Sequence, residues 1–374
     1  MLKNIDPIGL LAYCRKGFEK ECLQELQRIG GEHLVYGYSQ IESQQGWVLW
    51  RVTQGDIKTL YTKLEADKMV FVRQLYLLLA DLHIDNPKDR VTPMLESLQD
   101  AGRFGYLSIE APADDEQGSL HGLSKKLVPP LSSRLKKENL LTAKPSNRLP
   151  TCHVVCLSGT HFFITASTRP TASSYAEGVP RLRFDQEAPS RSALKIEEAF
   201  QVMLAPEEKA FVLKRGQKGV DLGAAPGGWT WYLVNQGLKM TAVDHGALAK
   251  SLMDDSDVAY VSADGFVYKP PKPVDWVVCD IVDKPMRTLE RMAVWFTSGW
   301  TKCALFNLKL PMKSRFDTVE ACLAKLQSRL EGADIAAEVR VKQLYHDREE
   351  VTVIVITPPL PPGLTKSAAP DKPG

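Results

Sequence analysis

The stretch DLGAAPGGWT, residues 221–230, decides the fold of this chain of 374 residues. It follows the short apolar run Gly219–Val220 and leads into WYLVNQG, residues 231–237, a pattern that predicts one helix ending at Gly237. A glycine-rich turn between a strand and a helix usually holds a ligand, because its backbone can approach the bound molecule closely. The surrounding sequence should therefore indicate which fold contains this turn and which class of ligand it binds.

Around this turn, apolar strand-like runs alternate with helical patterns. Strands are expected at 219–223, 239–244, 258–264, 274–282 and 304–310, and two more at 339–345 and 350–357, separated by the turn HDRE. Alternation of strands and helices predicts a parallel sheet with helices on both faces, and the final hairpin adds an antiparallel strand. We therefore predict an α/β, Rossmann-like domain over residues 190–357.

Two phosphate-binding classes do not fit the turn. A P-loop requires Lys followed by Ser or Thr after its glycines, and none follows Gly228. The dinucleotide fingerprint G-x-G-x-x-G fails because Ala225 and Pro226 stand where its second glycine belongs. Pro226 also removes an amide donor from the loop, which favours a ligand without phosphate at this point.

The turn resembles the S-adenosylmethionine loop of the FtsJ-like ribose 2′-O-methyltransferases, whose pattern D-x-G-[AC]-x-P-G-G-[WF] fits from Asp221 to Trp229. The resemblance implies that Asp244 meets the ribose hydroxyls of the cofactor and Asp264 the adenine amino group. Ser192, in PSRSALK, is implied as a further contact, although a helix cap explains it equally well. The implied cofactor contacts are Ser192, Asp221, Gly223, Ala225, Pro226, Gly227, Gly228, Trp229, Asp244, Asp264 and Asp280.

The same resemblance implies a catalytic Lys-Asp-Lys-Glu set. Its matching positions are Lys195 in SRSALKIEEAF, Asp280 in DWVVCDIV, Lys309 in FNLKLP and Glu350 in REEVTV. The predicted layout agrees, because Asp280 and Lys309 end parallel strands, where open α/β sheets bind their ligands. Glu350 begins a strand of opposite direction and is expected at the same edge.

We interpret Lys309 as the general base, since a ribose hydroxyl must lose its proton to accept a methyl group. Lys309 must be neutral to act, and partial burial and the second ammonium of Lys195 favour the neutral form. Asp280 and Glu350 are expected to orient the two lysines. Amino-group methylation is disfavoured because Asp280 is followed by Ile-Val-Asp rather than Pro-Pro and an aromatic residue, and Cys279 is expected to be a core residue rather than a nucleophile.

The N-terminal half predicts an α+β region without a recognisable catalytic motif. Its expected parts are a ferredoxin-like segment at 1–60 and an RNA-binding segment at 61–167, followed by a linker at 168–189; a disordered tail is expected at 358–374. Basic residues attract phosphate backbones. The candidates for RNA contact are Lys125, Lys126, Arg134, Lys136, Lys137, Lys144, Arg148, Arg181 and Arg183.

Longer runs, including YCRKGFEKEC, GVPRLRFDQEAPSRSALKIEEAF and LYHDREEVTV, resemble a bacterial branch of the same family across nearly the whole chain. This resemblance implies 2′-O-methylation of one cytidine of 23S ribosomal RNA before full subunit assembly, on naked or partly assembled RNA. It also implies that the segment 61–167 is a THUMP domain, a module that binds RNA.

Composition agrees with a cytoplasmic protein. The net charge is +2, no apolar run reaches the ~18 residues of a membrane helix, and the N-terminus lacks signal-peptide features. The seven cysteines are scattered without a CxxC pair, so reduced thiols and no metal are expected. Three other functions remain open: RNA binding without catalysis, methylation of an RNA base, and NAD-dependent oxidoreduction.

Overall fold

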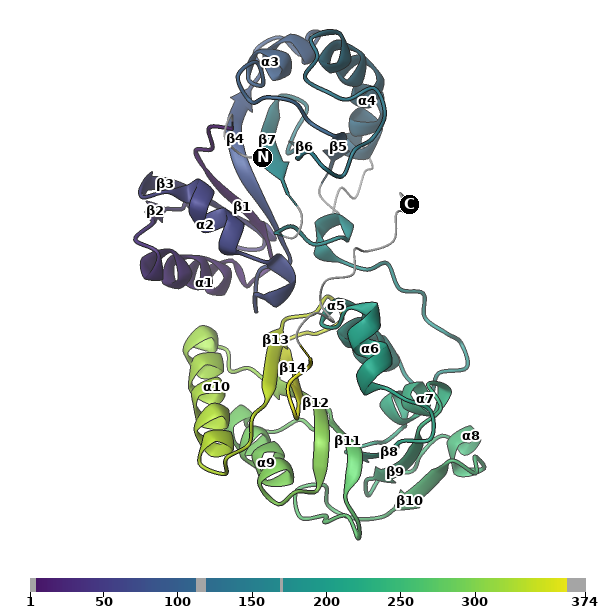
Figure 1. Ribbon diagram of the computed structural model, residues 1–374. Helices are drawn as coiled ribbons and strands as arrows, with labels where there is room; N and C mark the ends of the chain where they lie inside the picture. The colour runs from purple at the N-terminus through teal and green to yellow at the C-terminus, as the bar shows by residue number, and fades with distance from the viewer. Residues whose placement is uncertain (1–4, 112–118, 169–170, 362–374) are drawn as a thin grey trace. The chain divides into compact units, whose positions relative to one another are not determined.

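The computed structural model describes residues 5–111, 119–168 and 171–361. They form two compact units: Met1–Asp67 with Phe71–Gly178, and Lys68–Val70 with Val179–Gly374. Each unit is built on one seven-stranded sheet (Figure 1). Most of the expected tail, residues 362–374, lies outside the described residues.

The first unit is an α+β layer structure, as predicted. Its elements are β1 (Gly9–Tyr13), α1 (Glu19–Glu32), β2 (Tyr36–Tyr38), β3 (Trp47–Gln54), α2 (Ile57–Lys63), β4 (Gln74–His83), α3 (Val91–Glu96), β5 (Tyr106–Glu110), α4 (Ser119–Lys137), β6 (Thr151–Cys156) and β7 (His161–Ser167), with the 3₁₀ turns η1 (Ala66–Lys68) and η2 (Ala176–Gly178). The strand order is β2-β3-β1-β4-β7-β6-β5, and every pair is antiparallel except β5 with β6.

Strand β4 joins the two halves of this sheet. It pairs with β1 along Gln74–Leu78 and with β7 along Leu77–His83. The apolar run from Lys68 predicts an earlier start, but the buried carboxylate of Glu25 accepts hydrogen bonds from the amides of Phe71 and Val72, 2.8 and 3.2 Å away. Those amides therefore have a partner outside the strand ladder, and the strand begins only at Gln74.

Helix α4 carries most of the basic run. Leu127, Leu131 and Leu135 recur every four residues and are buried, because such spacing brings side chains to one face of a helix. The basic residues of the helix lie outside this buried face and are exposed to solvent: Lys125, Lys126, Arg134, Lys136 and Lys137.

The second unit is the predicted α/β sheet. Its elements are α5 (Ala193–Val202), α6 (Pro206–Val212), β8 (Lys218–Leu222), α7 (Gly228–Asn235), β9 (Lys239–Val243), α8 (Lys250–Met253), β10 (Val258–Val261), β11 (Val274–Cys279), α9 (Pro285–Thr297), β12 (Thr301–Lys309), α10 (Arg315–Glu331), β13 (Glu338–Lys342) and β14 (Glu350–Ile356). The strand order is β10-β9-β8-β11-β12-β14-β13. The pairs from β10 to β12 are parallel, and β14 runs antiparallel to both of its neighbours.

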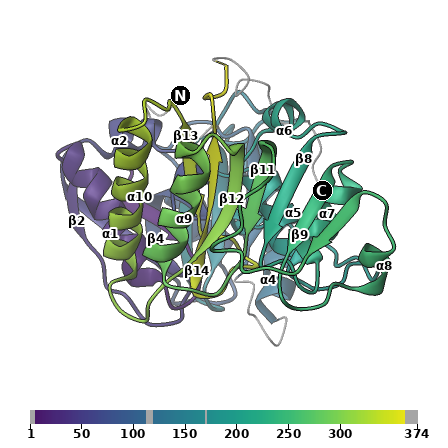
Figure 2. The ribbon, with the colours of Figure 1, turned by 90° about the horizontal axis from the view of Figure 1, so that it is seen from below.

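Helices cover both faces of this second sheet, as the alternation of strands and helices predicts. Helices α9 and α10 lie on one face, and α5 and α7 lie on the other (Figures 1 and 2). Leu289, Met292 and Phe296 form the buried stripe of α9, and Phe200 of α5 packs edge-on against Trp276 of β11 with ring centroids 5.4 Å apart. Packing of α9 and α5 against the second sheet holds its strands in place, and with them the residues at the strand ends. No helix of the described residues is long and apolar enough to cross a membrane.

Candidate active site

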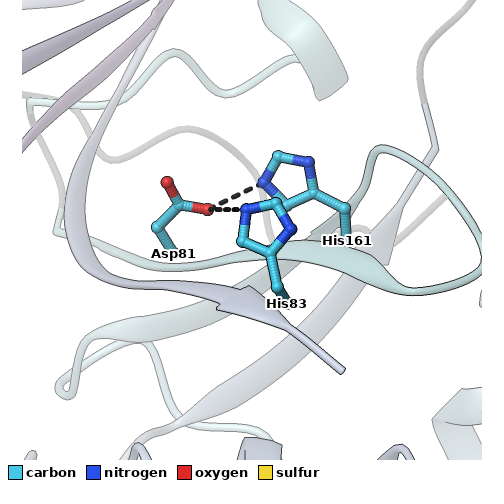
Figure 3. Close-up of side chains that lie close together, drawn as sticks. All are labelled: Asp81, His83 and His161. Atoms are coloured by element: carbon cyan, nitrogen blue, oxygen red, sulfur yellow. Dashed lines mark hydrogen bonds and ion pairs between the residues drawn. The ribbon is translucent and has the colours of Figure 1, made fainter. Parts of the chain in front are cut away.

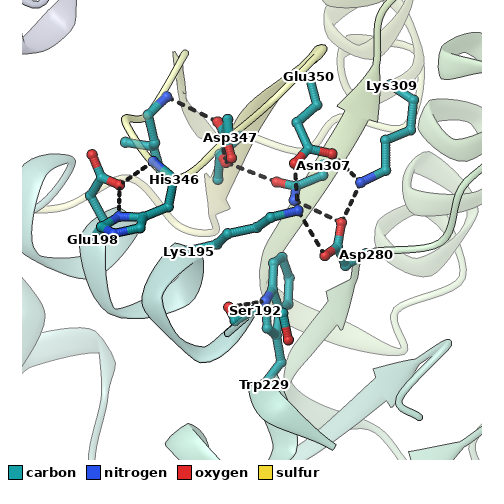
Figure 4. A network of polar contacts seen from close by, with 12 residues as sticks. Ser192, Lys195, Glu198, Trp229, Asp280, Asn307, Lys309, His346, Asp347 and Glu350 are labelled. Atoms are coloured by element: carbon teal, nitrogen blue, oxygen red, sulfur yellow. Dashed lines mark hydrogen bonds and ion pairs between the residues drawn. The ribbon is translucent and has the colours of Figure 1, made fainter. Parts of the chain in front are cut away.

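Four charged side chains from distant parts of the sequence meet at the carboxyl edge of the second sheet (Figure 4). Asp280 directly follows β11, Lys309 is the last residue of β12, and Glu350 is the first residue of β14. Lys309 and Glu350 are direct cross-strand partners because β14 runs antiparallel to β12. Lys195 reaches them from the first turn of α5.

The four side chains form a closed ring in which positive and negative groups alternate. Lys195 Nζ donates to Oδ2 of Asp280 over 3.2 Å and to Oε1 of Glu350. Lys309 Nζ donates to Oδ1 of Asp280 over 2.5 Å and to Oε2 of Glu350. Each lysine thus contacts both carboxylates, and the formal charges of this ring, which we call the charge ring, sum to zero.

The charge ring is mostly shielded from water, with side chains between 4% and 20% exposed. Burial alone would lower the pKa of Lys195, but the carboxylates of Asp280 and Glu350 outweigh it and the pKa is raised. Burial would likewise raise the pKa of Asp280, but Lys195 and Lys309 outweigh it and the pKa is lowered. The sequence analysis expected the two carboxylates to orient the lysines, and in the structure each carboxylate contacts both ammonium groups.

A buried hydrogen-bond chain supports Asp280 from behind the charge ring. Asn307 Nδ2 donates to Oδ1 of Asp280 over 2.8 Å, and Asn307 Oδ1 accepts from the hydroxyl of Thr352 over 2.8 Å. That hydroxyl also lies 3.1 Å from Oδ2 of Asp347. Burial, and then Glu350, raise the pKa of Asp347 well above its usual range. A protonated Asp347 can donate to Thr352, which leaves the hydroxyl hydrogen of Thr352 for Asn307 and fixes which way the Asn307 amide points.

The sequence analysis did not predict this series of hydrogen bonds behind Asp280. Asn307 is a polar residue inside the apolar run of β12, two positions before Lys309 and therefore on the same face of the strand. That placement was the available signal. Thr352 and Asp347 carried none, because only the folded structure brings them to Asn307.

The loop before β14 is held by a second buried carboxylate, Glu198 on α5 (Figure 4). Its oxygens accept hydrogen bonds from the amide of Tyr345 over 2.7 Å and from the amide and Nδ1 of His346 over 2.9 and 2.6 Å. The loop that leads to Glu350 is thereby tied to the helix that carries Lys195.

The glycine turn follows β8 as predicted, and α7 begins at Gly228. Gly223 and Gly227 have φ of 75° and 113°, the region that favours glycine. A Cβ on Gly228 would lie 2.3 Å from the hydroxyl oxygen of Ser192. Asp221 accepts a hydrogen bond from the hydroxyl of Thr230 over 2.7 Å, and burial raises the pKa of Asp221 to about 7.

Three candidate cofactor residues surround this turn. Asp244 follows β9 and accepts hydrogen bonds from the amides of Ala225 and Gly246 over 3.0 and 2.7 Å. Asp264 follows β10, and its Oδ1 accepts from the amide of Phe266 over 2.8 Å. Ser192 occupies the N-cap position of α5, but its side chain does not cap the helix. Its hydroxyl instead lies 2.6 Å from that of Ser190, and its carbonyl accepts from Trp229 Nε1 over 3.0 Å.

The remaining cofactor candidates differ in exposure. Trp229, Gly227 and Gly228 are buried, Gly223 and Ala225 are partly buried, and Pro226 is exposed. Trp229 is 3% exposed and therefore acts as a core residue that fixes the turn. Asp221 is the fourth residue of β8, and Asp244 and Asp264 follow the neighbouring strands β9 and β10, so the structure brings all three to the carboxyl edge of the sheet that carries the charge ring.

The candidate RNA contacts are exposed and divided between the two units. Lys125, Lys126, Arg134, Lys136 and Lys137 lie on α4, and Lys144 and Arg148 lie in the segment after it. Arg181 and Arg183 belong to the second unit and precede α5.

The buried cysteines behave as core residues. Cys279 is 1% exposed, and burial raises the pKa of its thiol to about 12, so the reactive thiolate is disfavoured. Burial likewise raises the pKa of the Cys152 thiol to about 12.

One cluster of the first sheet has the composition of a metal site, which the sequence analysis did not anticipate (Figure 3). Ligand atoms of Asp81, His83 and His161 lie within 4.8 Å of one another. His161 Nε2 lies 2.7 Å from Oδ1 of Asp81, and Arg51 pairs with Oδ2 of the same carboxylate. Both oxygens of Asp81 thus have protein partners, and the ring of His83 stacks on that of His161 with centroids 4.0 Å apart. Ion pairing and stacking account for this cluster, and we assign it no metal.

Comparison with known proteins matches nearly the whole chain. Three family descriptions cover successive segments: the RlmM ferredoxin-like domain over residues 8–76, ribosomal RNA large subunit methyltransferase M, N-terminal, over 89–168, and FtsJ-like methyltransferase over 188–330. A relative named ribosomal RNA large subunit methyltransferase M from Hahella chejuensis is 59% identical over 350 residues, 94% of this chain and 90% of the relative. A relative of the same name from Stenotrophomonas maltophilia is 45% identical over 93% of this chain and 96% of its own.

Similarity to solved structures is much weaker. A possible methylase from Clostridium difficile covers 96% of this chain and 100% of its own, at 12% identity and a TM-score of 0.33. Likeness of that size adds nothing on ligand or reaction.

Proposed function

This chain belongs to the ribosomal RNA large subunit methyltransferase M family, and on that premise we propose that it methylates the ribose 2′-hydroxyl of a cytidine in 23S ribosomal RNA. The family makes it an FtsJ-like methyltransferase with S-adenosylmethionine as its cofactor. The observation that carries the finer proposal is the charge ring of Lys195, Asp280, Lys309 and Glu350, which stands at the carboxyl edge of the sheet next to the glycine turn.

The residues around the turn fit S-adenosylmethionine. A Cβ on Gly223 would lie 2.4 Å from Ile281, so only glycine leaves the backbone bare at this point. Asp244 and Asp264 offer carboxylates beside that backbone, which suit the hydroxyl and amino donors of an adenosine. Six further candidates would complete the pocket: Ser192, Asp221, Ala225, Pro226, Gly227 and Gly228. Trp229, the remaining candidate, would support the turn from the core. When bound, the cofactor supplies the transferable methyl group on a positively charged sulfonium.

Lys309 would remove the proton of the 2′-hydroxyl. Its Nζ already directs two N–H groups at Asp280 and Glu350, so the remaining direction is the one open to a substrate. In its neutral form Lys309 can accept the hydroxyl proton there, and the ammonium that results lies between the carboxylates of Asp280 and Glu350. The proton thus moves from the ribose oxygen to Lys309 Nζ, and the oxygen gains the electron pair that forms the new bond to carbon.

Lys195 would act through the two carboxylates rather than as a base. Its raised pKa keeps it charged, and its ammonium bridges Asp280 and Glu350 on the side away from Lys309. The bridge holds both carboxylates in position while the charge on Lys309 changes during the reaction. A geometry that changes little between the two states of Lys309 is what preorganised electrostatic catalysis requires.

RNA binding would fall to the first unit together with the arginines before α5. We propose a ferredoxin-like part followed by a THUMP domain, with the exposed basic face of α4 contacting phosphates. The substrate would be 23S RNA before full subunit assembly, since later assembly covers RNA with protein.

Two alternatives remain distinguishable by experiment. A base methyltransferase with a covalent cysteine is disfavoured by the buried thiol of Cys279. Burying four charges is costly even when they are paired. A protein that only binds RNA would gain nothing from the charge ring in return for that cost.

The test is product analysis. Purified protein, methyl-labelled S-adenosylmethionine and protein-free 23S RNA from cells that lack the enzyme are incubated, and the RNA is digested to nucleosides. We expect the label in 2′-O-methylcytidine. Label in a base would overturn the ribose assignment. Absence of label, with the cofactor bound, on both free RNA and precursor particles would favour a protein that only binds RNA.

A further inference from the structure

The two most exposed large hydrophobic side chains of the described residues lie next to the charge ring in the chain. Met312 is 92% exposed and Val282 is 83% exposed, whereas Leu34, the next, is 69% exposed. Val282 follows Asp280 in the loop after β11, and Met312 follows Lys309 in the loop after β12. Because the carboxyl ends of parallel strands share one edge of a sheet, both side chains stand at the edge that carries the charge ring.

A third loop brings an aromatic side chain to the same edge. Tyr345 precedes β14, whose first residue belongs to the charge ring, and its side chain is 45% exposed. Its ring packs edge-on against His346, with centroids 5.2 Å apart and an interplanar angle of 88°. One face of an aromatic ring in this setting is a surface on which a flat group can stack.

Hydrogen bonds and an ion pair hold two of these loops, the one after β12 and the one before β14. Glu198 binds the amide of Tyr345, and the amide of Leu310 donates to the carbonyl of Glu349 over 2.7 Å. Arg315 also pairs with the carboxylate of Glu349, over 2.5 Å, and so links the start of α10 to the loop before β14. The loops that carry Met312 and Tyr345 are therefore linked to each other and to the helices beside them.

Each of the three loops also carries an exposed basic residue. Lys284 follows Val282, Lys313 follows Met312, and Arg348 follows Tyr345, all within three residues. Apolar or aromatic surface interleaved with positive charge is the composition that binds single-stranded nucleic acid, because bases cover the apolar groups and phosphates pair with the charges. A base stacked inside a helix could not cover these side chains.

We propose that the loops 281–284, 311–314 and 344–348 form a binding site for one unpaired nucleotide, whose base is covered by Val282, Met312 and Tyr345. Lys284, Lys313 and Arg348 would neutralise the phosphates on either side of it. The proposal rests on the proposed function, because it takes the ribose of this nucleotide to be the one that meets Lys309. It adds that the target is recognised only after its base has left any helix, so that Met312 and Val282 lose their contact with water on binding.

The test compares the full-length double variant Val282→Ser/Met312→Ser with the wild-type protein on protein-free, unmodified 23S RNA. We expect KM for RNA to rise about tenfold or more, since losing contacts to one base has effects of that size. Both side chains are largely in solvent, so the melting temperature and the dissociation constant of S-adenosylmethionine should stay at wild-type values. Met312→Leu and Tyr345→Phe, which keep the apolar and aromatic surfaces, should retain a near-normal KM, whereas Tyr345→Ala should not.

Met253→Ser is the matched control. Met253 lies on α8 in the same unit and is 49% exposed, so its replacement changes the same kind of surface away from the three loops, and KM should not move. If wild-type protein methylates the ribose and the double variant does so with unchanged kcat/KM, the nucleotide site is wrong while the proposed function stands. Unchanged kinetics with weakened sedimentation on precursor particles would make the loops a protein-docking surface instead. If the wild-type protein itself labels no ribose, both proposals fall together.

Discussion

The two seven-stranded sheets gather their polar side chains in different ways. In the second sheet, the strands from β10 to β12 are parallel, so residues at the carboxyl ends of different strands meet at a single edge, as Asp280 and Lys309 do. In the first sheet, neighbouring strands are antiparallel except β5 and β6, and polar groups pair locally across adjacent strands, as Asp81 and His161 do.

This difference predicts two kinds of sensitivity to mutation. In the second sheet the proposed catalytic residues share one edge, so replacing a single one of them should abolish methyl transfer. In the first unit basic residues are spread along α4, so replacing them one by one should lower the affinity for RNA in small steps. Substitutions in the charge ring should therefore have the largest effects, and substitutions on α4 the smallest.

Lys309→Ala should lower the rate of methyl transfer by about a thousandfold or more, because general-base catalysis typically contributes 10²–10⁴-fold and the substitution also opens the charge ring. Binding of S-adenosylmethionine, measured by calorimetry, should change little, since the proposed cofactor residues lie around the glycine turn. Lys325→Ala, a substitution on the exposed side of α10, is the control and should be silent. Equal loss of rate and of cofactor affinity would contradict the proposed role.

Two shielded carboxyls, one in each sheet, should give stability opposite dependence on pH. Burial raises the pKa of Asp221 to about 7, so its native state holds a proton that the unfolded chain releases near pH 4, and its contribution to stability is lost as pH rises. In the first sheet, burial would raise the pKa of Glu110, but the hydrogen bond and charge of His153 outweigh it and the pKa is lowered. The contribution of Glu110 is therefore present above pH 4.5 and lost in acid.

Thermal unfolding of cofactor-free protein across pH 3–8 checks this contrast. Asp221→Asn should remove a decline in the free energy of unfolding of up to about 4 kcal/mol between pH 4 and 7. Glu110→Gln should instead lower stability above pH 4.5 and leave it nearly unchanged below the folded-state pKa of Glu110. Parallel curves for the two variants would refute the assignment of opposite pKa shifts.

Asn307→Leu should lower kcat by about tenfold to a hundredfold, because Asp280 loses a buried hydrogen bond that keeps it in the charge ring. Thr352→Val removes only the group that orients Asn307 and should give a smaller loss. A role in orienting Asp280 predicts a lower kcat with little change in KM for RNA, together with a shifted pH profile of kcat. A variant that merely folds poorly would lose active protein without altering that profile.

The smallest effect is expected in the first unit. Replacing Lys125 and Lys126 of α4 with Gln should raise KM for RNA by several-fold and leave kcat unchanged, because phosphate contacts contribute affinity rather than chemistry. The dependence of log KM on log salt should become shallower by about one for each lysine that contacts a phosphate. Replacing Lys88, an exposed lysine outside α4, serves as the control. A loss of kcat as large as that of Lys309→Ala would erase the contrast between the two sheets.

Part of the arrangement of the candidate site could be predicted from the sequence pattern. Asp280, Lys309 and Glu350 stand at strand ends, and the direction of each strand follows from the alternation with helices, so their meeting could be expected. The register that pairs Lys309 directly with Glu350 could not, because it depends on where β14 enters the sheet.

Groups that support the charge ring were not predictable. Glu198 appears in the sequence as one more acid on a helix, and its role arises only because the loop before β14 folds over α5. Glu25 similarly delays the start of β4 by binding two amides 46 and 47 residues away in the chain. Contacts of this range depend on tertiary packing, which local periodicity does not encode.

The insertion of β14 between β12 and β13 has a consequence for synthesis on the ribosome. A chain that has emerged only as far as residue 349 has both lysines and Asp280 but lacks Glu350, and among the described strands β13 pairs with β14 alone. N-terminal parts of a chain can fold while the rest is still being translated. The charge ring is an exception, because it closes only when the last strand enters the sheet. If it is the catalytic set that we propose, a nascent chain should stay inactive until its final strand has been made.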